Sequence, residues 1–521
     1  MHIDIRPVAK LRDPGTVNVP AALGPLFDAL TSEAPVAETP VAETPIAETP
    51  VAETRDGTAV DLARLRVVCD WIQYRNNFSE PIHCRPVLAE RPHGPGIGDP
   101  RAAETALEIA LDLRRCDDPE MATTIKAALA GHLNLANPAR TILEPWVPTS
   151  ESCIWRFNTL YWQALKRWEQ ATGREYEQAL PGGRSDARNT ETVRELILEL
   201  FRVWDELDAR RALPEELYVV ELGVGNGNQA RTWLDVFAAV DRAHGRDYFR
   251  RLHYLMGDYS AHVLERARQT VGQYCDRVNA LVLDATRPQL TLGFLRGKAF
   301  GVYVSNVYDN LPTDEVASIQ GRPYLVEVRA YVRDQDAAAI ASRHNIPADT
   351  LGTLTERLLR LGPDLLAEAA PEHFPDVDHA VSLWREVWTA LRLQERYVPL
   401  EGLDDYRVSP SLTGEILRPL LGSSGDIRMH VSNGALASFT DTLPLLHPFG
   451  RLLSHDLFLT EPGQYHAGFY GPGKYDGSVV NWVNGPLLQL IGNRRGFDVQ
   501  IAPLRGRPAA TVKTLTAQVR D

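Results

Sequence analysis

The clearest pattern of apolar and polar positions in this chain lies in "YVVELGVGNGNQA", from Tyr218 to Ala230. An apolar run ends at an acidic residue, and three alternating glycines precede a helical pattern that places Trp233, Phe237 and Val240 on one face. Glycine permits positive φ and lets a ligand contact the backbone. Strand, glycine loop and helix in this order predict a nucleotide-type site in an α/β sheet. A tight turn that only leads into a helix is the simpler alternative.

The same alternation of strand and helix continues downstream. Three apolar runs end in polar residues, namely "RLHYLMGDYS" at Asp258, "VNALVLDAT" at Asp284 and "AFGVYVSNVYDNLP" at Asn306. The stretch "ALASFTDTLPLLHPFGRLLSHDLFL" predicts a helix, a turn and a strand, and "GFDVQIAPLRGRPAATVKTLTAQV" predicts two closing strands. Together they predict an α/β fold built on a doubly wound sheet.

Other regions show helical spacing instead. Apolar residues recur every three or four positions in "DLARLRVVCDWIQYR", in "AAETALEIALDLRRC" and in the aromatic-rich "CIWRFNTLYWQALKRWEQATG", whose aromatics we interpret as core. A further helix, "TVRELILELFRVWDEL", directly precedes the first strand. The long stretch from 313 to 425 interrupts the strand pattern and predicts a helical insertion.

Residues 35 to 54 form a five-residue repeat, PVAET, PVAET, PIAET, PVAET. Proline at every fifth position forbids a regular helix, and each copy is too polar to build a core. The repeat therefore predicts an extended tether, and a docking array for a partner is the alternative. The predicted division of the chain is a disordered N-terminus with this tether (1–60), a helical acceptor-side region (61–190), the first half of the main domain (191–312), a helical insertion (313–425) and the second half (426–521).

Composition narrows the class of protein. The 521 residues include 44% hydrophobic residues and carry a net charge of −13, which argues against general affinity for nucleic acids. The five cysteines show neither a CxxC motif nor zinc-type spacing. The first residues lack the apolar core of a signal peptide, and no run approaches the ~18 apolar residues of a membrane helix. We therefore expect a soluble, cytoplasmic protein without a membrane partner.

Three ligand classes compete for the glycine loop. A phosphate-binding P-loop requires a Lys-Ser or Lys-Thr pair that does not follow these glycines, and a dinucleotide fingerprint requires glycine where Asn228 stands. The remaining motif is E-x-G-x-G-x-G, at Glu221, Gly223, Gly225 and Gly227. In this motif, and in the order of the motifs after it, the chain resembles the class I S-adenosylmethionine-dependent methyltransferases from about residue 217 to its end.

The resemblance implies a Rossmann-like methyltransferase fold with an antiparallel last strand, and S-adenosyl-L-methionine as cofactor. It implies that Asp258 binds the ribose hydroxyls, that Asp284 accepts from the adenine amino group beside the Ala285 amide, and that Glu221 accepts from the methionine ammonium, directly or through water. Carboxylates suit these positions because they accept several hydrogen bonds. The predicted cofactor-binding residues are Glu221, Gly223, Gly225, Gly227, Asn228, Asp258, Tyr259, Asp284, Ala285 and Asn306.

Two stretches are distantly similar to the MidA-like methyltransferases (the DUF185 group). They are "SNVYDNLP" and "PGKYDGSVVNWVNGPLLQLIGNRRGFDV". That family is implicated in protein arginine methylation and in the assembly of respiratory complex I. The chain departs from it in three respects, because the family's N-terminal Gly-Asp-Phe-x-Thr motif is missing and the PVAET repeat and the long insertion are foreign to it.

Candidate catalytic residues follow the fourth strand, where this class places the reactive methyl group. Asp309 can orient or deprotonate an acceptor, Tyr308 can supply a wall or a hydrogen bond, and His455 beside Asp456 is the second acid–base candidate. No carboxylate cluster has convincing magnesium spacing, so we expect no metal. Methyl transfer itself requires mainly that the acceptor is held in line with the methyl group.

The large non-cofactor portion predicts a bulky acceptor, either a protein, a peptide or a large metabolite, methylated on N or O. The loop "EPGQYHAGFYGPGKYDG" is either a mobile lid over that acceptor or a packed connection. Two other functions stay open from the sequence. The protein can bind the cofactor without catalysis, as an assembly or scaffold factor, or it can be a nicotinamide-dependent reductase.

Overall fold

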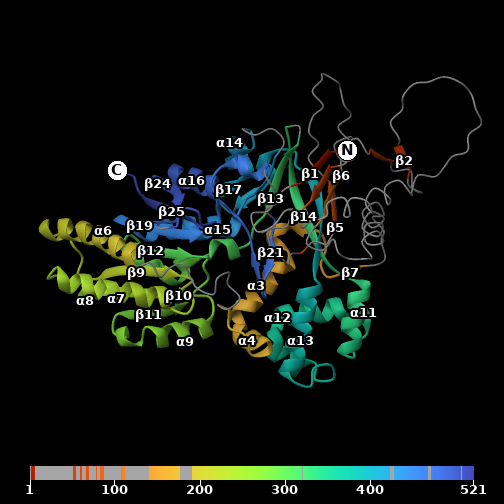
Figure 1. The fold of residues 1–521 in the computed structure, drawn as a ribbon, viewed down its shortest axis with the longest axis horizontal. Coiled ribbons are helices and arrows are strands. Elements are labelled where there is room, and N and C mark those ends of the chain that lie inside the picture. The colour runs from red at the N-terminus through yellow and green to blue at the C-terminus, as the bar shows by residue number, and fades with distance from the viewer. Residues whose placement is uncertain are drawn as a thin grey trace, which may run out of the picture.

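The structure, a computed structural model, describes residues 140–176, 190–319, 321–422, 427–466, 471–505 and 507–520, together with Phe78 and the backbone of six short strands nearer the N-terminus. Its central sheet has seven strands in the order β11-β10-β9-β12-β19-β25-β24, and β25 runs antiparallel to both of its neighbours (Figure 1). The bounds are β9 Leu217–Leu222, β10 Leu252–Asp258, β11 Val278–Val282, β12 Ala299–Ser305, β19 Leu446–Asp456, β24 Phe497–Pro503 and β25 Lys513–Val519. This order confirms the predicted α/β fold with an antiparallel last strand.

Helices cover both faces of this sheet. Successive residues of a strand point to opposite faces, so Val219 packs with Trp204 and Phe237 on one face, whereas Val220 packs with Phe439 on the other. The first face is covered by α6 (Thr190–Ala209) and α7 (Asn228–Ala243), and the second by α15 (Asn433–Thr442) and α16 (Gly485–Arg494). The sheet is thus doubly wound, as the strand–helix alternation of the sequence predicted.

The sequence predicts a helical insertion, and this prediction is incomplete. The insertion also contributes strands to a second sheet. Its antiparallel strands lie in the order β15-β14-β13-β18, and the preceding strands β7 and β8 pair with β14. Alternate residues of β14, such as Val326 and Val328, are buried, which is the period of a half-buried strand. The elements are β7 Arg140–Ile142, β8 Val147–Pro148, β13 Glu315–Ile319, β14 Arg322–Arg333, α11 Asp334–Arg343, α12 Leu351–Ala369, α13 Val377–Ala390, β15 Arg392–Pro399 and β18 Ile427–His430.

The prediction of helices between about 61 and 140 is wrong at two places. Strand β4 (Arg66–Cys69) lies inside the first predicted helix, and β6 (Leu107–Leu111) lies inside the second. They belong to a sheet of order β1-β4-β6-β5, with β1 at His2–Ile5 and β5 at Ile82–Pro86, so the first residues are not wholly disordered either. Their β-branched residues favour strands, and long-range pairing overrode the helical spacing.

The PVAET repeat lies outside the described residues except at its last copy. There β2 (Val51–Glu53) pairs with β3 (Ala59–Asp61). The remaining short elements are α8 Tyr248–Arg251, α10 Pro288–Leu292, β16 Arg407–Ser409, β17 Leu412–Thr413, α14 Arg418–Leu421, β20 Phe458–Leu459, β21 Gly473–Tyr475, β22 Ser478–Val480 and β23 Val483–Asn484. Among the helices that the structure describes, none has both the length and the apolar character needed to cross a membrane.

The aromatic-rich helices lie beside the carboxyl edge of the central sheet. They are α3 (Cys153–Gln163) and α4 (Leu165–Thr172), which Figure 1 shows between α9 (Ala261–Thr270) and α12. Their side chains Phe157 and Trp168 are buried in one core with Trp384 of α13, as expected for aromatics at helical spacing. These two helices therefore join the insertion to the main domain.

Candidate active site at the carboxyl edge of the central sheet

The glycine loop after β9 has the backbone conformation that its sequence predicts. Gly223, Gly225 and Gly227 have φ values of 73°, 57° and 81°, which side chains rarely adopt. Two of them are also required for packing, because a Cβ at Gly223 would clash with Val307, and one at Gly227 would lie 2.9 Å from the Ala267 Cα. The loop is therefore held tightly between the end of β12 and helix α9.

Asp258, at the end of β10, faces this loop. One carboxylate oxygen accepts from the Ser260 amide at 3.0 Å, and the other accepts from the Gly225 amide at 3.3 Å. Burial raises the pKa of Asp258 to about 6. Because each carboxylate oxygen can accept more than one hydrogen bond, the group is able to take hydroxyl donors as well. This fits the predicted contact with a ribose, which stays a prediction.

Glu221 is a deeply buried polar group beside the glycine loop. It is 2% exposed, and the Tyr254 hydroxyl donates to it at 2.7 Å. Burial raises the pKa of Glu221 to about 8. The charge of Asp258 adds to this increase, and the hydrogen bond from Tyr254 opposes it. A buried carboxyl group of this kind gains most from a cationic partner, which would stabilise its ionised form.

The residues predicted for the adenosine lie at the ends of β10 and β11. The Tyr259 hydroxyl accepts from the Gln163 side chain at 2.9 Å, and burial, then the charge of Asp284, raises the pKa of Tyr259. The exposed Asp284 accepts from the amide and the hydroxyl of Thr286 at 2.8 and 2.7 Å, and Ala285 follows it at the same edge. The structure places these residues at one edge of the sheet, and their binding roles stay predictions.

The two predicted asparagines lie at turns. The Asn228 amide donates to the Asn226 side chain at 3.1 Å where α7 begins. Asn306 is exposed with a φ of 52°, and its amide donates to the His455 carbonyl at 2.9 Å, which ties the end of β12 to β19. Positive φ in a residue other than glycine is uncommon and concentrates at functional sites.

The carboxyl groups of Asp309 and Asp456 form a buried pair. Asp309 is 5% exposed and Asp456 is fully buried, and the two are hydrogen-bonded to each other. Asp456 also accepts from the amides of Val307, Tyr308 and Leu457 at 3.1, 2.8 and 2.8 Å. Burial raises the pKa of Asp309 to about 6, and burial with the Asp309 charge raises that of Asp456 well above its usual range. Burial therefore favours the protonated form of Asp456, and its bonds to the backbone amides fix the turn after β12.

Tyr308 lies in the core, where it is 1% exposed and its ring lies 6.4 Å from that of Phe458. Its predicted role, as a wall or a hydrogen-bonding group, stays a prediction. The helical turn that begins at Tyr308 points its ring into the core. His455 bonds Thr514 at 2.9 Å through Nδ1 and is half-buried. The acid–base roles of Asp309 and His455 stay predictions.

The described part of the predicted lid loop is packed. Hairpin β21–β22 turns at Asp476, whose carboxylate accepts from Tyr161 at 3.1 Å and from the Trp168 indole at 3.0 Å. Tyr465, earlier in the loop, is 8% exposed. Residues 467–470 lie outside the described residues, so for them the choice between a lid and a packed connection stays a prediction.

Sequence reasoning missed the side chains that α3 and α4 bring to the site. Gln163 contacts Tyr259, and a Cβ on Gly225 would lie 2.9 Å from the Tyr176 hydroxyl. Asn158 joins the turn after β12 to β22, because it donates to the Asn310 carbonyl at 2.9 Å and accepts from the Val479 amide at 2.9 Å. The only available signal was polar residues within an aromatic helix, which does not reveal their partners.

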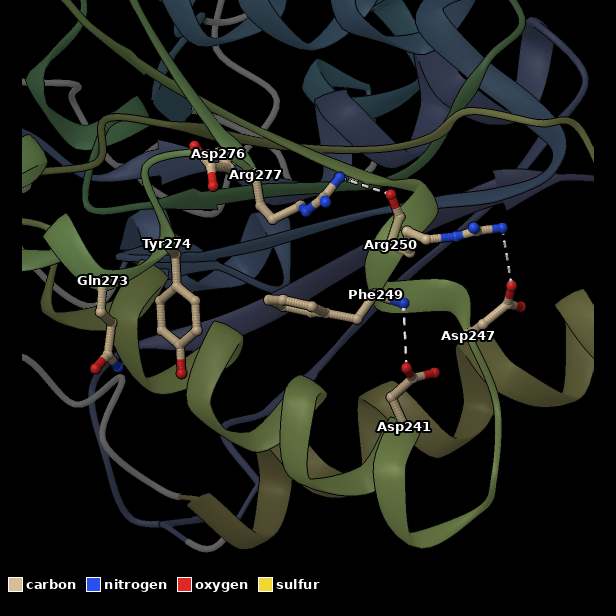
Figure 2. A pocket seen from close by; sticks show the side chains of 8 residues that line it. All are labelled: Asp241, Asp247, Phe249, Arg250, Gln273, Tyr274, Asp276 and Arg277. Carbon is tan, nitrogen blue, oxygen red and sulfur yellow. Dashed lines mark hydrogen bonds and ion pairs between the residues drawn. The ribbon is translucent and has the colours of Figure 1, made fainter.

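A cleft of about 420 Å³ lies elsewhere, at the amino ends of β10 and β11 (Figure 2). The glycine loop lies at the opposite ends of these strands, where ligands of doubly wound sheets bind. The cleft is therefore separate from the candidate site. It is lined by Asp241, Asp247, Phe249, Arg250, Gln273, Tyr274, Asp276 and Arg277.

Of the comparisons with known proteins, the one with solved structures gives matches. No family model matches the chain, and no curated protein matches it. One matching structure is an uncharacterized COG1565 superfamily protein from Burkholderia thailandensis, with 15% identity, a TM-score of 0.40, and 75% of this chain and 90% of that chain covered. A second COG1565 superfamily member from that organism, a candidate methyl transferase bound to S-adenosyl-homocysteine, has 14% identity, a TM-score of 0.42, and 75% and 91% covered. The DszA carbon methyltransferase has 12% identity, a TM-score of 0.31, and 71% and 67% covered.

Proposed function

We propose that this protein is an S-adenosylmethionine-dependent methyltransferase. The observation that carries the proposal is the convergence of Glu221, Asp258 and Asp284 at the carboxyl ends of three neighbouring strands, around a glycine loop in left-handed conformation. Ligands of doubly wound sheets bind at this edge. A row of acidic groups beside exposed backbone suits a ligand with hydroxyl, amino and ammonium donors, and it disfavours the phosphates of a nicotinamide dinucleotide.

The residues present fit this cofactor. Glu221 would accept from the ammonium group, because its buried carboxyl lacks a cation among the contacts described above. Asp258 would accept from the ribose hydroxyls, and Asp284 from the adenine amino group, next to the Tyr259 ring. When bound, the cofactor supplies a methyl group that its sulfonium already activates. The protein contributes binding, alignment of the acceptor and exclusion of water.

The acceptor side of the proposal is a nitrogen or oxygen on a bulky molecule, either a protein, a peptide or a large metabolite. Support comes from the second sheet and the helices α11 to α13, which add a large body beside the site. The pair of Asp309 and Asp456 lies at the end of β12, where a proton would have to be held or accepted.

One observation favours a second function, a cofactor-binding assembly factor without catalysis. The predicted acid–base residue Asp309 is only 5% exposed, and its partner Asp456 is fully buried. An acceptor reaches this pair only if the surrounding turn opens. Both functions share the cofactor site and differ in turnover.

The test is methyl transfer in a lysate from cells that lack the protein. Purified protein and isotope-labelled S-adenosylmethionine are added, labelled products are identified by mass spectrometry, and S-adenosylhomocysteine release is measured. Asp258→Ala, which removes a cofactor contact, is the negative control. Label transfer by the wild type and not by Asp258→Ala supports the methyltransferase. Tight binding without transfer supports the assembly factor.

A further inference from the structure

Tyr176 lies above the glycine loop although it comes from the segment that follows α4. Its hydroxyl oxygen is 2.9 Å from the place where a Cβ on Gly225 would stand. Trp162 of α3 contacts the Tyr176 ring edge-on at 5.7 Å, and the neighbouring Gln163 donates to the Tyr259 hydroxyl at 2.9 Å. The aromatic rings of Tyr176 and Tyr259, from different parts of the chain, therefore lie beside the glycine loop and the end of β10.

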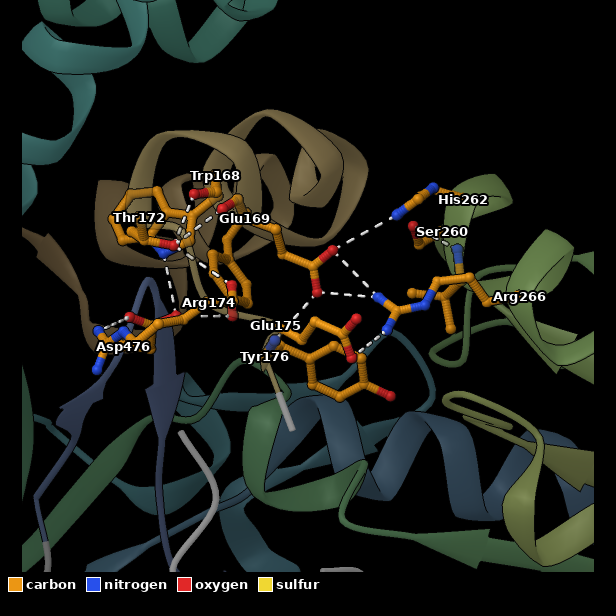
Figure 3. A network of polar contacts seen from close by, with 12 residues as sticks. Trp168, Glu169, Thr172, Arg174, Glu175, Tyr176, Ser260, His262, Arg266 and Asp476 are labelled. Atoms are coloured by element: carbon orange, nitrogen blue, oxygen red, sulfur yellow. Dashed lines mark hydrogen bonds and ion pairs between the residues drawn. The ribbon is translucent and has the colours of Figure 1, made fainter. Parts of the chain in front are cut away.

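Arg266 of α9 holds this segment against the main domain. Its guanidinium group contacts both carboxylate oxygens of Glu169, at 3.0 and 3.1 Å, and Glu175 at 2.8 Å (Figure 3). Glu169 in turn accepts from the Tyr176 amide at 3.0 Å and lies 3.5 Å from His262. The side chains of Arg266 and Glu169 are only 20% and 12% exposed, so solvent screens this ion pair less than a surface pair.

Helix α4 is anchored in its core, and the residues after it contact α9 and the hairpin through charged side chains. Leu165 and Trp168 are buried at 0% and 4%, which anchors the helix in its core. The helix ends at Gly173, whose φ is 65°, so Tyr176 is no longer part of the helical hydrogen-bond ladder. Arg174, 61% exposed, contacts Asp476 of the hairpin at 3.6 Å (Figure 3).

We propose that Tyr176 is a wall of the cofactor site, and that the ion pair between Arg266 and Glu169 holds it closed and so controls cofactor exchange. A ligand laid along the backbone at Gly225 must contact the Tyr176 side chain, because even a Cβ at this position would lie 2.9 Å from its hydroxyl oxygen, closer than van der Waals contact allows. The ligand cannot leave along this side until the ring moves. The inference rests on the proposed function, since it assigns a residue that positions the same cofactor.

The test is the rate at which S-adenosylhomocysteine dissociates, measured by stopped-flow displacement with excess S-adenosylmethionine. Tyr176→Ala is expected to raise the dissociation rate about tenfold or more, and Tyr176→Phe, which keeps the ring, to raise it much less. Arg266→Gln is expected to raise the rate several-fold, with a rate that depends less on salt than that of the wild type. Arg268→Gln is the matched control, because Arg268 lies on the same helix, is 59% exposed, pairs with the neighbouring Glu265 and donates to the Ala280 carbonyl at 3.3 Å.

The outcomes separate this inference from the proposed function. If the wild type does not bind S-adenosylhomocysteine, the proposed function fails and the wall fails with it. If the wild type binds, and the folded Tyr176→Ala and Arg266→Gln variants release the ligand at the wild-type rate, the wall alone is refuted. Equal acceleration in Arg268→Gln would also overturn it, because the charge of α9 would then be the cause. Where Tyr176→Ala does not fold, the rate of Arg266→Gln decides between these outcomes.

Discussion

Cofactor binding should release a proton from Glu221. In the unliganded protein burial raises the pKa of this group from its usual 4.5 to about 8, so at pH 7 about nine-tenths of the molecules carry the proton. If Glu221 accepts from the cofactor ammonium, the bound state requires the ionised form. We therefore expect about 0.9 proton to be released per cofactor at pH 7, and about 0.1 at pH 9.

The assay is titration calorimetry in two buffers of different ionisation enthalpy, because the difference in measured heat gives the number of protons exchanged. Glu221→Gln is the control, since glutamine keeps an oxygen for the Tyr254 hydroxyl and cannot titrate. The ammonium group of the ligand also titrates, and the variant reports this contribution alone. Between pH 6 and 8 the wild type should gain affinity relative to the variant, by about tenfold per pH unit at most.

Stability supplies an independent check on the same group. The folded pKa of Glu221 is raised above its unfolded value, so its favourable contribution is complete below about pH 4.5 and is lost as the pH rises toward 8. Without cofactor, the free energy of unfolding of the wild type should therefore fall relative to Glu221→Gln over this range. Equal heats in both buffers, together with parallel stability curves, would refute the role of Glu221.

Three other predictions concern the loop, the carboxyl pair and the repeat. Gly225→Val should abolish S-adenosylmethionine binding while the protein stays folded, because a side chain there meets the Tyr176 hydroxyl and requires a strained φ; unchanged affinity by calorimetry would exclude the loop as the site. Asp309→Asn should keep cofactor affinity within a few-fold and lower turnover by about 10²-fold. It should also reduce the loss of stability as the pH rises from about 4 to 6, because asparagine does not titrate, and a change in stability without a change in turnover would make Asp309 structural. Deleting residues 35–50, which leaves β1 and β2 in place, should not alter melting temperature or cofactor affinity, and a large drop in either would mean that the repeat packs on the domain.

The sequence predicts the central sheet well because its signals are local. Residues such as Val219 and Val220 lie in continuous apolar runs that end at acidic residues, and the glycines require a conformation that few other residues adopt. A strand signal is present in the insertion too, since Val326, Val328 and Ala330 alternate with polar residues, but the longer helical periods on both sides of it dominate the pattern.

The sequence identifies site residues only where they lie in the motifs at the ends of the predicted strands. Asp309 and Asp456 are separate candidates in the sequence, and the structure brings them together because β12 and β19 are parallel neighbours although far apart along the chain. Tyr308 looked available because sequence does not show that a helical turn after β12 points its ring inward. Tyr176 and Gln163 carry no signal of their own, since their contacts exist only once α3 and α4 pack beside α9.

The central claim is that the carboxylates around the glycine loop bind S-adenosylmethionine. Equilibrium binding of S-adenosylhomocysteine to the wild type and to Asp258→Ala tests it most directly, with NADH as the rival ligand. We predict one site per chain in the wild type, no competition by NADH, and binding to Asp258→Ala weaker by about 1–3 kcal/mol, the cost of leaving polar ribose groups unpaired. Equal affinity of the two proteins, or binding of NADH in place of S-adenosylhomocysteine, would contradict the assignment.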